Sequence, residues 1–160
     1  ISNHAAVKNA NVYSDILGKI CVDITQRNPI ARVVEENDSY YIDEDGQRMP
    51  LSNHYTARTL VISGNVAVVN SEALFQIAEY IYKDPFWNAQ IMQVHIEDNE
   101  DLTLIPRVGY HQIVFGEVES FEEKFSNLKL FYEKGISYKG WNNYSSINLK
   151  FKNQIVCTKK

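Results

Sequence analysis

The sequence predicts an α+β fold, in which a mixed or antiparallel β-sheet carries two packed helices. Alternating apolar and polar residues recur along the chain, most clearly at 19–26, and this period of two is typical of strands. Tyr and Phe favour strands and are plentiful, with 10 and 7 copies. Two segments, 71–83 and 120–134, instead repeat apolar residues at helical spacing. At 160 residues the chain fits one domain or two small ones.

The first part of the chain predicts two strands and a connector. Residues 7–13 have strand composition, 15–18 form a turn, and 19–26 alternate clearly. The connector is Arg27-Asn28-Pro29-Ile30-Ala31-Arg32, where Pro29 restricts its own backbone and that of the preceding residue to extended geometry. Because the strand pattern continues beyond it, we interpret this segment as an extended connector and the best candidate for a domain boundary.

A hairpin, a strand and a helix follow. The hairpin turns at Asp43-Glu44-Asp45-Gly46, which we interpret as a solvated turn, since no spaced downstream glutamate completes a metal loop. A strand at 59–63 precedes a helix at 71–83, which Asn70 or Ser71 caps and Pro85 stops. Phe86-Trp87 is interpreted as a packing anchor.

The second half predicts strands at 89–96, 102–108 and 111–115, and then the best-defined helix. Pro106 lies inside a strand pattern, which indicates a sheet edge or a bulge. Ser120 and Glu123 have the spacing of a capping box at the start of helix 120–134, and Gly135 is the expected end.

The last strand pattern covers Ile147–Thr158. Its odd positions are apolar except Asn153, and its even positions are mostly polar, which predicts a half-buried strand. A turn at Lys152-Asn153 would split it into a hairpin, and the pattern leaves both possibilities open. The last strand of a chain either lies inside a sheet, with a neighbouring strand on each side, or forms an edge of the sheet. The unpaired backbone groups of an edge can pair with another chain.

The residues predict no enzyme, cofactor or metal site. Known catalytic and nucleotide-binding motifs are absent from the sequence, and a net charge of −4 without a basic stripe argues against nucleic acid. We interpret His95 and His111 as half-exposed strand histidines; a hydrolase using them is the enzyme alternative. Cys21 and Cys157 are expected as buried thiols. No stretch reaches the length of a membrane span, and a start at Ile1 suggests an excised fragment.

Several motifs, taken in order, resemble the periplasmic region of the FtsQ/DivIB family of bacterial cell-division proteins, with a style closest to Bacteroidetes members. Arg27, Pro29 and Ala31 match an R-x-P-x-A connector, and Asp43 with Gly46 matches a D-x-x-G hairpin. Further matches are Phe115-Gly116, a helix with Lys124, Phe125 and Leu128, and the strand Ile147-Asn148-Leu149-Lys150-Phe151.

The resemblance implies a partial POTRA domain at 1–31, comprising its last two strands, and a β domain at 32–160. It implies a non-enzymatic divisome scaffold, anchored in the inner membrane by a single pass, with this fragment in the periplasm. Its partners would be FtsB-like (DivIC) and FtsL-like proteins, which add a strand to the last strand, with other divisome proteins as further partners of the POTRA part.

The partner-binding residues implied in this way are Tyr144, Ile147, Leu149, Lys150, Phe151, Lys152, Asn153, Gln154, Ile155 and Val156. The interdomain connector residues are Arg27, Pro29, Ala31 and Arg32. Lys150 stands where relatives often have Arg, and lysine lacks the bidentate fork of arginine. The alternative function is a POTRA-type client-binding module of an outer-membrane assembly or secretion protein, which would bind near Lys19–Gln26.

Overall fold

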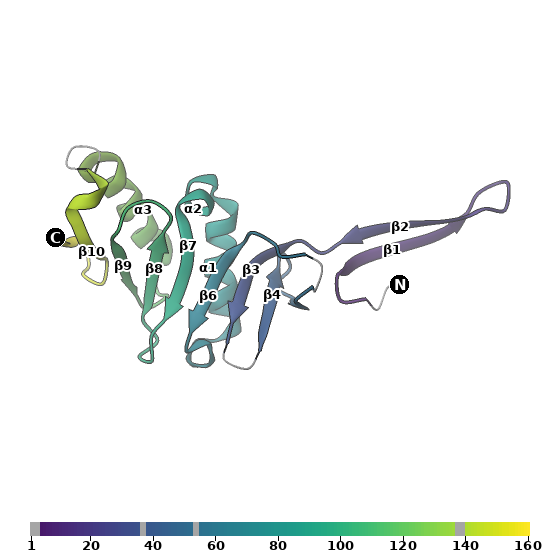
Figure 1. Ribbon diagram of the computed structural model, residues 1–160, viewed down its shortest axis with the longest axis horizontal. Coiled ribbons are helices and arrows are strands. Elements are labelled where there is room, and N and C mark those ends of the chain that lie inside the picture. Colours follow the sequence, from purple (N-terminus) through teal and green to yellow (C-terminus); the bar gives the residue numbers. More distant parts are fainter. Residues whose placement is uncertain (1–3, 36–37, 53–54, 137–139) are drawn as a thin grey trace.

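The computed structural model describes residues 4–35, 38–52, 55–136 and 140–160. Figure 1 shows an elongated molecule, with a hairpin projecting from one end of a sheet that carries helices. The strands are β1 (Val7–Ser14), β2 (Ile20–Gln26), β3 (Pro29–Val34), β4 (Ser39–Asp43), β5 (Arg48–Pro50), β6 (Leu60–Gly64), β7 (Ile91–Ile96), β8 (Leu102–Pro106), β9 (Gln112–Gly116), β10 (Tyr144–Asn148) and β11 (Val156–Lys159). The longer helices are α1 (Ser71–Lys83), α2 (Pro85–Gln90) and α3 (Phe121–Phe131), and short helical turns are η1 (Val66–Val68), η2 (Tyr132–Ile136) and η3 (Trp141–Asn143).

The described strands form one large mixed sheet and one small sheet. The large sheet has the order β11-β10-β9-β8-β7-β6-β3-β4-β5, and β1 pairs with β2 in a separate two-stranded sheet. Within the large sheet, β3–β6, β6–β7 and β9–β10 are parallel pairs, and the other neighbours are antiparallel. The predicted α+β fold with a mixed sheet is therefore confirmed, with α2 as a third, short helix.

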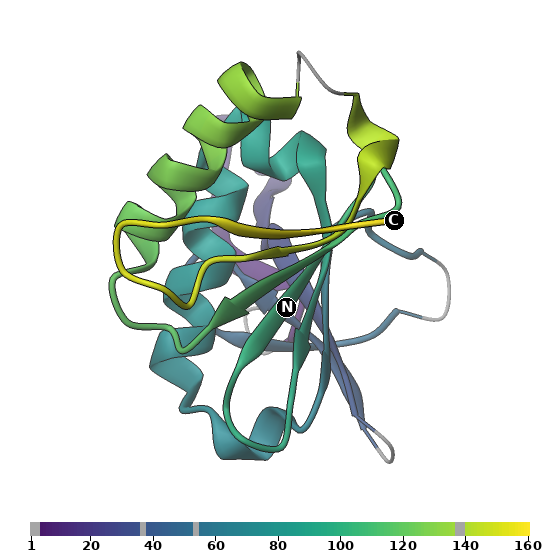
Figure 2. The ribbon, with the colours of Figure 1, turned by 90° about the vertical axis from the view of Figure 1, so that its left-hand side faces the viewer.

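The core lies between the large sheet and its helices. Parallel neighbours need a long crossover, and here α1 and α2 connect β6 to β7 while α3 connects β9 to β10. Figure 2 shows these helices together on one side of the sheet. Their apolar stripes cover a row of side chains that are at most 1% exposed, one from each of five neighbouring strands: Ile62, Val94, Leu104, Ile113 and Ile147.

Helix α1 forms over the residues predicted for it. Asn70 caps its first turn, because its side-chain oxygen accepts a hydrogen bond from the Ala73 N–H at 2.7 Å. After α1 ends, Pro85 begins α2, with Asp84 as its cap, so the strand predicted from residue 89 starts only at Ile91. Trp87 is 1% exposed in α2, which confirms the packing anchor.

The ends of α3 differ from prediction. Ser120 has a left-handed backbone and makes no side-chain cap, because that geometry does not aim its hydroxyl at the free amides of the first turn. The capping box is therefore wrong. Gly135 does not end the helix either, since η2 continues to Ile136 as a π-type turn. A Cβ on Gly135 would lie 2.8 Å from the Phe131 ring, so the glycine serves packing.

Pro106 does not mark a sheet edge. It ends β8, an inner strand, and its partner Ile91 adjoins a register shift in β7. The bulge alternative is thus the one that the structure confirms. Next to this shift Ile91 is 1% exposed, whereas Met92 is 40% exposed.

Candidate functional site at the C-terminal hairpin

The last two strands form a hairpin at one end of the large sheet. β10 pairs with β9 in parallel and with β11 in antiparallel, and β11 is the last strand in the order. The prediction of a single strand over Ile147–Thr158 is wrong. The alternative, a hairpin with a turn at Lys152-Asn153, is confirmed. Asn153 breaks the alternation because it lies in the turn, with a left-handed φ of 60°.

Three of the predicted partner-binding residues root this hairpin in the core. Tyr144, Ile147 and Leu149 are 7%, 0% and 5% exposed. The Tyr144 ring also lies 5.9 Å from the Phe131 ring, centroid to centroid. Their side chains are therefore covered by the protein itself, and they hold β10 in place instead of presenting a surface.

Lys150 ties the turn of the hairpin to the neighbouring β7–β8 turn. Its ammonium Nζ lies 2.6 Å from Asp101 Oδ2, and this hydrogen-bonded ion pair lowers the pKa of the Asp101 carboxyl. The aliphatic stem of Lys150 runs over Gly116, where a Cβ would lie 2.8 Å from Lys150 Cγ. Lys150 thus forms contacts within the chain, and the partner contact that the resemblance implies for it stays a prediction.

The rest of the predicted site is accessible. Phe151 is 52% exposed and Val156 is 44% exposed. Lys152, Asn153 and Gln154 are also exposed, and Ile155 is half-buried against the core. Between this turn and the start of α3 lies a cleft of about 280 Å³, lined on one side by Glu119 and Glu123 and on the other by residues 149–155.

Among the described residues, no strand pairs with the side of β11 that faces away from β10. Two hydrogen bonds show which of its backbone groups point to that side. The Leu149 N–H donates to Val114 O at 2.9 Å, so Leu149 and Ile147 direct their amides toward β9. At the far end the Lys160 N–H donates to Asn143 O at 3.2 Å. Since amide directions alternate along a strand, the N–H and C=O groups of Cys157 and Lys159 point away from β10 to the open edge.

The prediction did not include these two residues of the open edge. Cys157 and Lys159 lie one and three positions beyond the last residue predicted, and only the position of the turn reveals which backbone groups are free. The Cys157 side chain is half-buried beside the core, and burial raises the pKa of its thiol. Cys21 is also a free, half-buried thiol, so the expectation of two buried thiols is wrong.

The hairpin differs in charge from the chain as a whole. It carries Lys150, Lys152, Lys159 and Lys160, and the last acidic residue of the sequence is Glu133. The whole chain has a net charge of −4. Positive charge is therefore concentrated at the end of the sheet that has the free edge.

The connector residues lie at the opposite end of the sheet. Arg27 follows β2, and its Nη1 lies 2.7 Å from Oδ2 of Asp43. Pro29 begins β3 opposite Asp43, Ala31 is fully buried, and Arg32 pairs with Tyr41 across the β3–β4 ladder. Two of the motifs that carried the resemblance, R-x-P-x-A and D-x-x-G, are thus joined by an ion pair. Asp43 is 0% exposed, which the expected solvated turn did not foresee.

The two histidines of the enzyme alternative differ in exposure and in their hydrogen-bond partners. His95 is half-exposed, with Nδ1 3.1 Å from Ser63 Oγ and Nε2 3.9 Å from Glu97. His111 is 2% exposed, contrary to prediction, with Nε2 2.9 Å from Tyr132 Oη. Burial, and then the charge of Lys160, lower the pKa of His111. Within residues 4–35, 38–52, 55–136 and 140–160, no group of three or more His, Cys, Asp or Glu could hold a metal; His54 lies outside them.

The fold and this site define an α+β protein with one long mixed sheet that ends in a free, basic strand edge. The model of the family "FtsQ/DivIB, C-terminal related" matches residues 28–158. The chain therefore belongs to the FtsQ/DivIB, C-terminal related family, and is an FtsQ/DivIB-type cell-division protein.

Solved structures and curated proteins add context. The chain is similar to the major extracytoplasmic domain of the trans isomer of the bacterial cell division protein DivIB from Geobacillus stearothermophilus. The two are 18% identical with a TM-score of 0.43, covering 64% of this chain and 87% of that one. No curated protein matches the chain. In the part of the chain that the structure describes, no helix is long and apolar enough to cross a membrane.

Proposed function

We propose that this chain is a non-enzymatic scaffold of the bacterial divisome that recruits FtsB-like (DivIC) and FtsL-like proteins by β-strand addition. The partner strand would pair with β11 and extend the large sheet. In this role the protein would link early and late division proteins and septal peptidoglycan synthesis. It would act as the periplasmic part of an inner-membrane protein with a single pass. The observation that carries the proposal is the outward backbone of β11 at Cys157 and Lys159.

The rooting of the hairpin supports this proposal energetically. A strand that is already held in the bound geometry loses little conformational entropy when a partner pairs with it. β10 provides that hold through Tyr144, Ile147 and Leu149, and Lys150 fixes the turn. The other edge of the sheet, β5, is only three residues long and ends in Pro50, which has no N–H to donate.

The charge of the hairpin defines the partner further. Lys152, Lys159 and Lys160 repel a second copy of the same edge, so they disfavour pairing between two β11 strands. They favour a partner strand that carries acidic side chains. The association rate should therefore fall as salt is added, because salt screens the attraction between surface charges beyond about 8 Å at physiological ionic strength.

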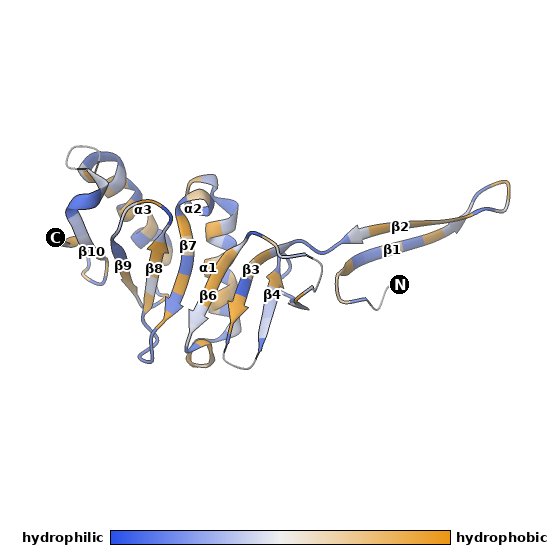
Figure 3. Cartoon of the chain, viewed as in Figure 1, coloured by the Kyte–Doolittle hydropathy of each residue, from blue (hydrophilic) through white to orange (hydrophobic). Residues whose placement is uncertain are grey.

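The N-terminal hairpin is assigned, as part of this proposal, to the end of a POTRA domain at 1–31, with the β domain at 32–160. One face of the hairpin carries Val12, Ile20, Val22 and Ile24, all at least 40% exposed. An isolated two-stranded hairpin is at best marginally stable in water. The orange stretches along β1 and β2 in Figure 3 mark apolar residues of this hairpin. Its exposed apolar face is therefore suited to a larger domain that covers it.

A pair of substitutions at one exposed position tests strand addition. Lys159→Pro removes an N–H that points to the open edge, whereas Lys159→Ala removes only the side chain. We expect the proline variant to lose binding to the periplasmic part of an FtsB-like protein and the alanine variant to retain most of it. Thermal unfolding should confirm that both variants are folded. Equal affinity of both variants would contradict β-augmentation at β11.

The client-binding alternative has one observation in its favour. β2 also has a side without a paired strand, and its apolar residues Ile20 and Ile24 are 73% and 55% exposed. A protein of that kind would bind extended client segments at β2. Binding that survives Lys159→Pro but is lost on Ile24→Pro would favour this alternative.

A further inference from the structure

The N-terminal hairpin, β1 and β2, has no share in the apolar core. No residue among the described positions 4–29 is buried, and the hairpin projects from the end of the large sheet (Figure 1). Apolar packing therefore cannot set the direction in which this arm points. Whatever holds its direction has to be found among polar contacts where the arm meets the sheet.

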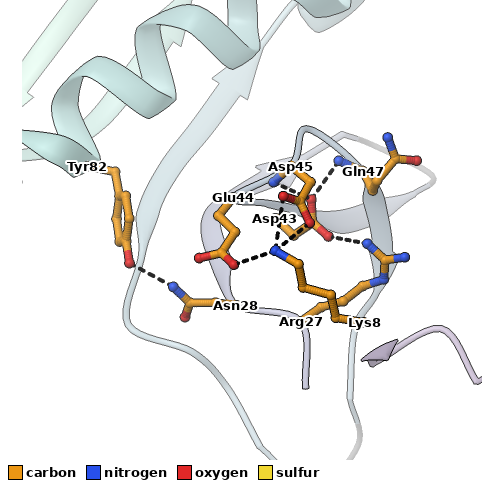
Figure 4. A network of polar contacts seen from close by, with 8 residues as sticks. All are labelled: Lys8, Arg27, Asn28, Asp43, Glu44, Asp45, Gln47 and Tyr82. Atoms are coloured by element: carbon orange, nitrogen blue, oxygen red, sulfur yellow. Dashed lines mark hydrogen bonds and ion pairs between the residues drawn. The ribbon is translucent and has the colours of Figure 1, made fainter. Parts of the chain in front are cut away.

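Those contacts converge on the acidic turn between β4 and β5. Figure 4 shows Arg27, which follows β2, directed at Asp43, at 2.7 Å between Nη1 and Oδ2. The other carboxylate oxygen of Asp43 accepts hydrogen bonds from the N–H groups of Asp45 and Gln47, at 3.0 and 2.7 Å. Asp43 is 0% exposed, so one buried carboxylate both shapes the turn and holds the base of the arm.

The other strand of the arm reaches the same turn. Lys8 of β1 places its Nζ 2.8 Å from Glu44 Oε1 and 2.8 Å from Asp45 Oδ2. Hydrogen bonds to Asp45 and Glu44 raise the pKa of Lys8 to about 12, so the ammonium stays charged in both contacts. β1 and β2 are thus each tied to one turn.

Backbone and side-chain contacts of the connector complete the junction. The Glu44 N–H donates to Asn28 O at 3.0 Å, and the Asn28 amide donates to Tyr82 Oη at 2.7 Å, which links the connector to α1. The base of the arm is therefore held by contacts of Lys8, Arg27 and Asn28, and a change in the direction of the arm has to break some of them.

From this geometry we propose that Asp43-Glu44-Asp45-Gly46 is a clasp that sets the orientation of the N-terminal arm. Lys8 and Arg27 are its positioning residues on the arm. The clasp fixes how a surface carried by the arm is placed relative to the β11 edge, at the other end of the molecule. This role is independent of which partner binds at β11, and concerns residues that do not take part in that binding.

The buried and exposed contacts contribute differently. Breaking a buried ion pair leaves an uncompensated charge in the protein, whereas exposed pairs contribute little individually. The Arg27–Asp43 pair should therefore contribute most of the energy that fixes the direction of the arm. The ion pairs of Lys8 should further restrict the range of directions that the arm samples. Loss of both should let the arm swing while the core stays folded.

Distance measurements between two spin labels test the clasp. One label is attached at Leu17→Cys, in the tip of the arm, and the other at Leu130→Cys, on α3; these positions are 88% and 49% exposed. Cys21 and Cys157 are replaced by serine in every variant. We expect a narrow distance distribution in this parent protein, and a broader, shifted one in the Lys8→Ala/Arg27→Gln variant.

Two further variants serve as comparisons. Asp43→Asn keeps an oxygen for the turn amides but removes the charge opposite Arg27, so it should also broaden the distribution. Arg48→Ala breaks an ion pair with Asp38 on the same β4–β5 hairpin without touching the arm, and should leave the distribution unchanged. A broad distribution in the parent, or a narrow one in the Lys8→Ala/Arg27→Gln variant, would overturn the clasp. Neither result bears on strand addition at β11.

Discussion

The two ends of the molecule are both antiparallel hairpins, but they are held by different forces. The N-terminal hairpin β1–β2 has a nearly complete ladder over seven residue pairs and no buried residue. The C-terminal hairpin β10–β11 has a shorter ladder, yet its first strand contributes Tyr144 and Ile147 to the core. Backbone pairing alone thus forms a hairpin. Burial of its side chains in the core determines whether the hairpin has a fixed position relative to the large sheet.

This difference assigns separate roles to the two hairpins. The arm is directed by charged contacts at one turn, so its direction can be changed without unfolding the sheet. The C-terminal hairpin cannot move without exposing core residues, so it presents β11 as a fixed edge. A rigid edge suits strand addition, because the partner does not have to order it first.

The largest expected effect comes from the core of the C-terminal hairpin. Ile147→Ala should lower the free energy of unfolding by about 2–5 kcal/mol, because it leaves a cavity at a side chain that is 0% exposed. Ile24→Ala in the arm, at 55% exposure, should change it by about 0.5 kcal/mol or less. Urea unfolding of both variants measures the contrast, and similar losses would remove the distinction between the hairpins.

The next effect is pH dependence at His111, which packs beside the start of the C-terminal hairpin. Tyr132 Oη, the Trp141 ring and the charge of Lys160 face its imidazole. Because burial lowers its pKa in the folded protein, the unfolded chain takes up the proton first as pH falls below 6.5. Above pH 6.5 the imidazole is neutral in both states and does not change the free energy of unfolding. Below pH 6.5 the free energy of unfolding falls, by up to about 1.4 kcal/mol for each unit of difference between the two pKa values.

Urea unfolding at a series of pH values from 8 to 5 measures this slope. A His111→Gln variant cannot take up the proton, so its stability should be flatter between those limits even if it is lower overall. If the free energy of unfolding depends on pH equally in both proteins, protonation of His111 is not linked to folding.

The smallest effect is expected at the Lys150–Asp101 pair. Asp101→Asn should cost about 1 kcal/mol or less, because the Lys150 side chain is 42% exposed and the pair is screened. The lowered pKa of Asp101 means that this stabilisation is present above pH 3.8 and is lost as pH falls through the folded-state value. High salt should reduce the difference between the two proteins; a difference that survives high salt would indicate a packing role for Lys150 over Gly116.

Local patterns predicted much of this fold. α1 begins and ends at the residues that its apolar spacing, its cap and Pro85 indicate. Most strands of the sheet before β10 and the α+β class were also predictable, because the alternation of side chains indicates which residues face a core. The resemblance singled out Arg27 and Asp43 in two separate motifs, and their contact with each other appears only in the structure.

Non-local contacts explain what could not be predicted. The last strand pattern is split by the turn at Asn153, and next to this turn Lys150 contacts Asp101 and Gly116, which are remote in sequence. Asp43 is buried beside Arg27, which neutralises it from the connector, and His111 is buried beside the aromatic residues Tyr132 and Trp141. None of these partners lies within the local window on which periodicity depends.

Hydrogen exchange on the complete chain, alone and with an excess of the periplasmic part of an FtsB-like protein from the same organism, tests the central claim most directly. Strand addition at β11 predicts new protection of the Cys157 and Lys159 amides, which point to the open edge, with little change in β10. Protection at β2, or a lack of new protection at β11 under saturating partner, would contradict recruitment through the C-terminal edge.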